Sequence, residues 1–211
     1  MNPVPPINID AAHGTALPPY WLAQARVLIV DDSDFTLKLI GAVIHGAGFR
    51  KIETARDGLI ALEKTQQFDP HIVLLDLEMP NLDGFGYLDR ARKELPKPPI
   101  PIIVQTSLEE RDAKLAALAC GADDFLNKPL DPDELMLRVR LHLERYFMLK
   151  DLSEMRHYLE IKLALAQQMV ENTKRNPGKQ PATLDVLRQH REVLEKIAHF
   201  SPVKPGISDL R

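Results

Sequence analysis

The sequence has very little cysteine: Cys120 is the single one in 211 residues, so the chain cannot form an intramolecular disulfide or a cysteine-rich zinc site. It has no apolar run near the length of about 18 residues that a membrane span needs. Its N-terminus lacks the basic stretch and apolar core of a secretory signal. The net charge of −3 argues against binding nucleic acid through bulk charge. We expect a cytoplasmic protein that contacts neither membrane nor nucleic acid directly.

The composition is that of an ordinary globular protein, with 45% apolar and 27% charged residues. The length corresponds to one or two domains. Residues 1–24 are rich in proline and show no apolar period, which predicts a flexible proline-rich arm. Near the end of this arm, Trp21 and Leu22 either dock on the domain that follows or lie on the surface without a role.

Short apolar runs alternate with stretches of helical spacing from residue 25 to residue 145. The runs at 27–30 and 72–75 are entirely apolar, as parallel strands covered on both faces must be. Right-handed crossovers between such strands give a doubly wound α/β fold, here with a five-stranded parallel sheet. We expect strands at 27–30, 51–55, 72–75, 100–105 and 124–127, and helices at 35–47, 58–67, 85–94, 109–119 and from 133 onward.

The residues that follow these strands are the candidates for chemistry, because doubly wound sheets bind ligands outside the carboxyl ends of their strands. Asp31 and Asp32 follow the first strand, and Asp76 follows the third. Neighbouring carboxylates repel one another unless a cation is present. Mg²⁺ suits such a group, because it takes a few carboxylates and keeps several waters. The sequence therefore predicts a magnesium site at this edge of the sheet.

Two further polar residues stand at the same edge, Thr106 after the fourth strand and Lys128 after the fifth. A phosphoryl group would complete the shell of the ion, and these two side chains would contact its other oxygens. Asp76 is the natural nucleophile, because an aspartate can form an acyl phosphate. Each residue alone is more often a turn, cap or surface residue, as we expect for Asp34. Their joint occurrence at four of the five strand ends favours a phosphoryl site.

Four motifs in a fixed order resemble those of a known family. They are Val-Leu-Ile-Val-Asp-Asp at 27–32, Leu-Leu-Asp-Leu-Glu-Met-Pro-Asn-Leu-Asp-Gly at 74–84, Ile-Ile-Val-Gln-Thr-Ser at 102–107 and Gly-Ala-Asp-Asp-Phe-Leu-Asn-Lys-Pro at 121–129. With these motifs, residues 26–145 resemble the receiver domain of two-component response regulators, including the chemotaxis regulators. The resemblance implies a flavodoxin-like receiver domain at 25–145.

The resemblance also implies a role in a phosphorelay. Asp76 would accept a phosphoryl group from a phosphohistidine on a partner histidine kinase. Asp32 and Asp76 would ligate Mg²⁺ directly and Asp31 largely through water, while the backbone carbonyl of Glu78 would be a further ligand. Such a domain is a signalling receiver and not an enzyme, apart from the chemistry of its own phosphorylation and dephosphorylation.

Further roles follow from the same resemblance for residues around the phosphoryl group. Thr106 and Lys128 would contact its oxygens. Pro80 and Gly84 would shape the loop after the phosphoacceptor, with Gly84 in a backbone conformation that a side chain would hinder. Pro129 completes the Lys-Pro pair of the last motif.

The family couples a hydroxyl to an aromatic ring as its switch, and here the pair would be Thr106 and Phe125. Phosphorylation would draw Thr106 toward the phosphoryl group, and the ring would turn inward to fill the space. Phe125 lacks the hydroxyl of the tyrosine often found there, so an inward state would depend on packing alone, and a plain core role is an equal alternative. Glu78 and Leu108 flank the path of attacking water and would tune dephosphorylation.

The fifth helix does not end with the domain. Residues 133–175 contain neither proline nor glycine, which predicts one long helix. Positions 141, 145, 148, 152, 155, 159, 162, 166 and 169 are spaced alternately by four and three, and seven of the nine are apolar. This is the pattern of a coiled-coil seam. We expect a parallel homodimer through these helices, with a single helix folded back on its own domain as the alternative.

Asn-Pro-Gly at 176–178 would break this helix, and residues from Thr183 to Phe200 predict a second one. The two helices would form a dimerisation or output extension at 146–200, as a helical hairpin or a coiled coil. Residues 201–211 predict a linker or disordered tail. We expect His157 and His190 to be surface or seam residues and not phosphotransfer histidines.

The sequence shows no known output signature: no helix-turn-helix unit, no Gly-Gly-Asp/Glu-Glu-Phe motif of a diguanylate cyclase and no glycine-rich ATP site of a kinase. Three functions stay open. The chain is a regulator that signals through its C-terminal helices by dimerisation or by binding a downstream protein. Alternatively it is the N-terminal part of a longer regulator with a cyclic-di-GMP synthesis or hydrolysis domain, since residues 137–152 are similar to the helix that joins such domains. The third possibility is a phosphorelay intermediate.

Overall fold

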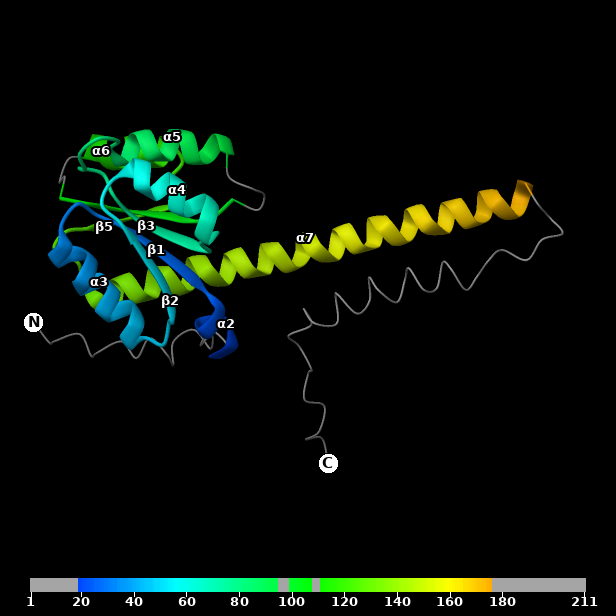
Figure 1. Ribbon diagram of the computed structural model, residues 1–211, viewed down its shortest axis with the longest axis horizontal. Coiled ribbons are helices and arrows are strands. Elements are labelled where there is room, and N and C mark those ends of the chain that lie inside the picture. Colours follow the sequence, from blue (N-terminus) through cyan, green and yellow to red (C-terminus); the bar gives the residue numbers. More distant parts are fainter. Residues whose placement is uncertain (1–18, 95–98, 108–110, 176–211) are drawn as a thin grey trace, which may run out of the picture. The chain divides into compact units, whose positions relative to one another are not determined.

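A computed structural model describes residues 19–94, 99–107 and 111–175 of the chain (Figure 1). Strands and helices alternate there, as the apolar periodicity predicted. The strands are β1 (Arg26–Val30), β2 (Lys51–Ala55), β3 (Ile72–Asp76), β4 (Ile102–Thr106) and β5 (Asp124–Asn127). The helices are α2 (Pro19–Gln24), α3 (Asp34–Gly46), α4 (Gly58–Phe68), α5 (Gly84–Glu94), α6 (Arg111–Ala119) and α7 (Pro132–Arg175).

The strands form one five-stranded parallel sheet in the order β2-β1-β3-β4-β5. The predicted doubly wound α/β fold is therefore confirmed. Because β1 lies between β2 and β3, the order of the strands reverses there, and a ligand crevice forms at such a reversal. The register pairs Val30 with Leu75, so the residues just after β1 and at the end of β3 reach the same edge of the sheet together.

The start of β4 differs from the expectation. We expected this strand to begin at residue 100, but it begins at Ile102. Pro101 has no N–H to donate to a neighbouring strand, so it cannot join the ladder on both sides. Its carbonyl oxygen still accepts a hydrogen bond from the Val73 N–H, at 3.0 Å.

Helices cover both faces of the sheet, which explains why the three central strands β1, β3 and β4 are buried almost throughout. In Figure 1, α4, α5 and α6 lie over one face, and α3 and the first part of α7 lie over the other. Leu28 of β1 belongs to the first core together with Tyr87 of α5. Its neighbour Ile29 belongs to the second core together with Ile40 of α3 and Val139 of α7. The alternation of side chains along a strand therefore divides the interior into two layers.

The predicted long helix is confirmed as α7. Tyr146 of this helix is buried, and Phe147 packs against both cores. The first compact unit extends to Glu154 and includes these aromatic side chains. Residues from Met155 belong to a second unit, which the structure describes as far as Arg175.

Part of the expected flexible arm is helical, which the sequence did not predict. Trp21 of α2 contacts Phe147 of α7, with 5.0 Å between the ring centroids. The Ala25 N–H donates to the Trp21 carbonyl oxygen at 2.7 Å and joins α2 to the start of β1. Of the two alternatives for Trp21, docking on the domain is therefore the one observed.

Several expectations concern residues outside the described ranges. These are the first 18 residues of the arm, Leu108, the second helix with His190, and the tail at 201–211. Among the helices that are described, none is both long and apolar enough to cross a membrane.

Candidate functional site

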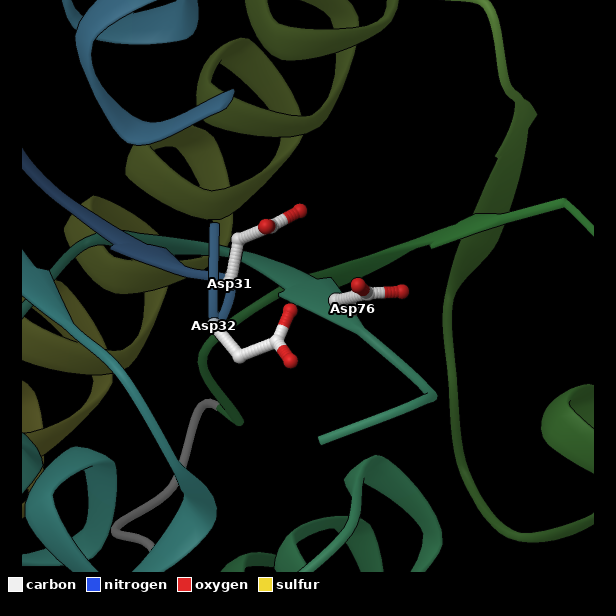
Figure 2. A group of neighbouring side chains, drawn as sticks. All are labelled: Asp31, Asp32 and Asp76. Atoms are coloured by element: carbon white, nitrogen blue, oxygen red, sulfur yellow. The ribbon is translucent and has the colours of Figure 1, made fainter. Parts of the chain in front are cut away.

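Three carboxylates meet at the carboxyl edge of the sheet (Figure 2). Asp31 and Asp32 directly follow β1, and Asp76 ends β3. One oxygen of each lies within 4.8 Å of the others. Asp31 and Asp76 are 0% and 5% exposed, whereas Asp32 faces solvent. The structure therefore places side by side the three aspartates that the sequence selected as metal ligands.

Lys128 reaches this cluster from the end of β5. Its Nζ lies 2.8 Å from an Asp31 carboxylate oxygen and 2.7 Å from an Asp76 carboxylate oxygen. Burial lowers the pKa of Lys128, but the hydrogen bonds to the two carboxylates outweigh burial and raise its pKa above the usual value. The ammonium therefore stays charged and neutralises part of the buried negative charge. The peptide bond that follows, between Lys128 and Pro129, is cis.

For the pKa of Asp76, burial outweighs the effect of Lys128. It raises the pKa of this carboxyl, and the nearby Asp31 raises the pKa further, against the opposing effect of Lys128. One ammonium does not balance the group, because three ionised aspartates and Lys128 have a net charge of −2. A divalent ion with a preference for oxygen fits both this charge and the donor set. The residues present therefore fit Mg²⁺.

The loop after Asp76 folds closely around the end of β3. A Cβ atom at Gly84 would clash with the Asp76 carbonyl oxygen and would lie 2.7 Å from Leu77 Cα. The Gly84 N–H donates to the Leu77 carbonyl oxygen at 3.0 Å. Glycine is needed here because of this close approach, and not because of a left-handed backbone. In the same loop, Pro80 is exposed.

A second anchor of this loop comes from α4 and was missed by the sequence reasoning. Buried Asp57 caps α4 by accepting from the Ile60 N–H, and its other oxygen accepts from the Asn81 side chain, both at 2.8 Å. These hydrogen bonds lower the pKa of Asp57. Asn81 has a φ of 63°, a left-handed conformation that asparagine tolerates. The sequence predicted a helix from residue 58 but gave Asp57 no role.

Glu78 and Ser107 form a hydrogen bond close to the aspartate cluster. The Ser107 hydroxyl donates to a Glu78 carboxylate oxygen at 3.0 Å, and both side chains are exposed. The Glu78 N–H points back to an Asp76 carboxylate oxygen at 3.5 Å. The sequence placed Ser107 at the correct edge but gave it no role, because a contact between two loops cannot be read from either loop alone.

The expected switch pair lies on the face covered by α4, α5 and α6. Thr106 is 2% exposed, and its carbonyl oxygen accepts from the Lys128 N–H at 2.9 Å. Phe125 is half-buried and packs at the border of that core. The Lys114 ammonium lies 5.3 Å from the centre of its ring. Phe125 therefore has core contacts on one side and a cation near its face.

This architecture and this cluster belong to a known family. Residues 27–140 match the family model of the response regulator receiver domain. The chain is a member of the response regulator receiver family. Receiver domains are signalling modules that bind Mg²⁺ at an acidic pocket and interact with histidine kinases. This match confirms the resemblance to the receiver domain that the four motifs indicated.

Relatives with very different names share this domain. Protein-glutamate methylesterase/protein-glutamine glutaminase 2 of Rhodopseudomonas palustris is 44% identical over 106 residues, which cover 49% of this chain and 28% of that protein. The chain spans about a quarter to a half of the length of the curated relatives it matches.

Two solved structures show the same fold. One is the CheX–CheY–BeF₃–Mg complex from Borrelia burgdorferi, with 34% identity and a TM-score of 0.52, covering 56% of this chain and 87% of the matched chain. The other is a two-component system response regulator/GGDEF domain protein, with 31% identity and a TM-score of 0.57, covering 61% of this chain and 52% of the matched one.

Proposed function

We propose that the protein is a Mg²⁺-dependent phosphoryl acceptor of a two-component phosphorelay, with Asp76 as the residue that a histidine kinase phosphorylates. One observation carries this proposal: the buried Asp76 carboxylate lies among two more carboxylates and the Lys128 ammonium at the strand-order reversal of a receiver fold. We place this function in the cytoplasm, where an unpaired cysteine such as Cys120 stays reduced.

Asp31, Asp32 and Asp76, with the Glu78 carbonyl, would hold the ion. The bound ion would supply positive charge that offsets the repulsion between these carboxylates and an incoming phosphoryl group. Within the chain, Lys128 already orients the Asp76 carboxylate through a 2.7 Å ion pair. Together with the Thr106 hydroxyl, its ammonium would bind phosphoryl oxygens once the group has arrived.

The transfer itself is a single displacement. A carboxylate oxygen of Asp76 forms the new bond to phosphorus, while the bond between phosphorus and the kinase's histidine nitrogen breaks. The nitrogen keeps the electron pair and takes up a proton from solvent. Because attack requires the ionised carboxylate, the raised pKa of Asp76 makes its pairing with Lys128 important for reactivity.

Phosphorylation would then change the packing beside the site. Thr106 would move toward the phosphoryl group, and Phe125 would turn into the space next to α6 and β5. The half-buried position of Phe125 supports this role, because the ring already borders the core on one side. The output would pass through the C-terminal helices, by dimerisation or by binding a downstream protein.

A second function is supported by the solved response regulator/GGDEF domain protein, of which this chain matches about half. The chain would then be the receiver and linker helix of a longer regulator that makes or degrades cyclic-di-GMP. Reading the gene beyond the codon for Arg211 tests this alternative directly. A GGDEF-type domain in the same frame would establish it, and a stop codon would refute it.

Phosphorylation of Asp76 is tested with radiolabelled acetyl phosphate and Mg²⁺, followed by mass spectrometry of the labelled peptide. We expect one phosphoryl group per chain, complete loss of label in Asp76→Asn and loss of label when Mg²⁺ is chelated. Asp34→Asn is the matched control, because Asp34 is a nearby exposed aspartate that pairs with Arg56. Equal labelling of the Asp76→Asn variant would overturn the proposal.

A further inference from the structure

Helix α7 carries a row of large apolar side chains that face solvent. Seven of them are between 43% and 66% exposed: Leu141, Met148, Leu149, Leu152, Met155, Leu159 and Leu163. Large apolar residues exposed singly are common on protein surfaces, but several close together along one helix indicate a contact with another protein surface.

The row follows the heptad period of a coiled coil. Met148 and Met155 fall at d positions, and Leu152 and Leu159 fall at a positions, which gives four consecutive apolar layers. Earlier on the same helix, the side chains that pack on the receiver sheet, such as Val139, fall at other positions of the heptad. The exposed row is therefore not used to fold the receiver domain.

The ends of the apolar run are marked by charge. Arg145 occupies the a position before it, and Lys162 occupies the d position after it. A charged residue within a seam favours the register in which it meets its own counterpart near solvent instead of an apolar layer. Sliding one helix by a heptad would bring Arg145 against Leu152. The charges therefore favour two helices that are in register.

The flanking positions carry complementary charges. Asp151 lies at a g position, and Arg156 lies at the e position of the next heptad, five residues later. In a parallel pair, a g residue faces the e residue of the following heptad of the other helix, so each Asp151 would face an Arg156. An antiparallel pair sets g against g and e against e, which separates the two residues. Within its own helix, the Arg156 side chain lies 3.8 Å from a Glu160 carboxylate oxygen and is 75% exposed.

We propose that a second copy of this chain covers the row, as a parallel, in-register coiled coil in which Asp151 of each copy pairs with Arg156 of the other. This inference names the partner for the proposed output through the C-terminal helices, and its role in signalling rests on that proposed function. The self-complementary charges favour a second copy over an unrelated partner, because one helix sequence supplies both members of each pair. The pairing occurs twice by symmetry.

Charge exchange in the full chain tests the pairing. Asp151→Arg and Arg156→Asp each place like charges opposite one another, and we expect each to raise the dimer dissociation constant about tenfold in sedimentation equilibrium at low salt. The double variant Asp151→Arg/Arg156→Asp restores opposite charges, and we expect a dissociation constant near that of the native chain. Glu154→Arg is the matched control, because Glu154 is exposed at a c position off the seam, and it should leave the constant unchanged.

A cross-link then fixes the direction of the helices. Leu152→Cys in a Cys120→Ser background should form an interchain disulfide rapidly under mild oxidation, because identical a positions meet only in a parallel, in-register pair. A chain that stays monomeric throughout would show that the row is covered by something else, such as residues 183–200 of the same chain, and would overturn the inference. A dimer whose dissociation constant is unchanged by Asp151→Arg and by Arg156→Asp would also overturn the inference.

The proposed phosphoryl chemistry is measured separately. The dimer should form equally in Asp76→Asn, so an intact dimer without labelling would refute the phosphorylation site alone. Labelling of a monomeric chain would refute the coiled coil alone.

Discussion

The two ends of the receiver sheet bury titratable groups in opposite ways. At the amino edge, His71 is 5% exposed and contacts the rings of Tyr146 and Phe147, at centroid distances of 5.6 and 5.0 Å. Its Nδ1 accepts from the Arg26 N–H at 3.3 Å. At the carboxyl edge, buried Asp31 and Asp76 share the ammonium of Lys128.

The difference shows which end is built for ion chemistry. Burial, together with nearby positive charge from Arg26, lowers the pKa of His71 to about 3, so the imidazole is neutral at neutral pH and needs no counter-ion. The carboxyl edge instead keeps charges of both signs and retains an excess of negative charge. A neutral buried group stabilises one packed state, whereas an unbalanced charged group invites a cation or phosphoryl ligand.

Removing Lys128 should have the largest effect on this contrast. Lys128→Met leaves two buried carboxylates without a cation, and we expect the free energy of unfolding at neutral pH to fall by about 3 kcal/mol in the absence of Mg²⁺. Millimolar Mg²⁺ should restore most of the loss, because the ion replaces the missing positive charge. Urea denaturation with and without Mg²⁺ measures both effects.

Lys93→Met is the control for this variant, since Lys93 pairs with Asp89 on the surface of α5 at a side-chain exposure of 70%. Its free energy of unfolding should change by no more than about 0.5 kcal/mol, with or without Mg²⁺. If Lys128→Met and Lys93→Met lost the same free energy of unfolding, Lys128 would not be neutralising a buried cluster of carboxylates.

Lowering the pH should destabilise the domain mainly through His71, at the amino edge of the sheet. The folded-state pKa of His71 lies below its ordinary value of 6.5, so the unfolded chain binds more protons between about pH 3 and that value. Stability is therefore complete above this range and falls as the pH drops through it. Between about pH 7.5 and about pH 4.5, we expect His71 to account for a loss of about 2 to 3 kcal/mol.

The measurement is urea denaturation of the native chain and of His71→Gln at both pH values. Glutamine keeps an acceptor for the Arg26 N–H but does not titrate, so the variant should lose that much less stability on acidification. An identical acid response in the two proteins would assign the acid sensitivity to other groups.

The smallest effect concerns the surface of the carboxyl edge. Ser107→Ala removes the hydrogen bond to Glu78, and because both groups are exposed, water replaces it. We expect the free energy of unfolding to change by less than about 0.5 kcal/mol, and Mg²⁺-dependent labelling to persist. A thermal or urea melt checks the first expectation, and a large loss would mean that this contact holds the loop as firmly as the buried bonds do.

The sequence was most informative where one local pattern decides the outcome. Apolar runs such as those at 27–30 and 72–75 identified central strands of the sheet, and the unbroken stretch at 133–175 identified α7. The site residues could be chosen because parallel strands end at one edge, so position after a strand predicts position in space. Lys128 is 52 residues from Asp76 in the chain, yet this rule placed the two together.

Other features depended on contacts between distant segments and were missed. The role of Asp57 arises from its bond to Asn81, 24 residues away, and that of Ser107 from its bond to Glu78. Helix α2 was not predicted, because it begins at a proline in a proline-rich stretch and docks through Trp21 on Phe147 of a distant helix. No local period marks such contacts.

By itself, the sequence determined the order of the elements, the parallel sheet, the acidic edge and the heptad row on α7, because apolar period and strand-end position are local properties. Only the tertiary structure decided how charge is distributed inside the domain. Burial raises the pKa of Asp76 and lowers that of His71, although both are ordinary titratable residues in the chain. The reason is that the free energy of an ionised group depends on the water it loses and the charges it meets, and both are set by packing.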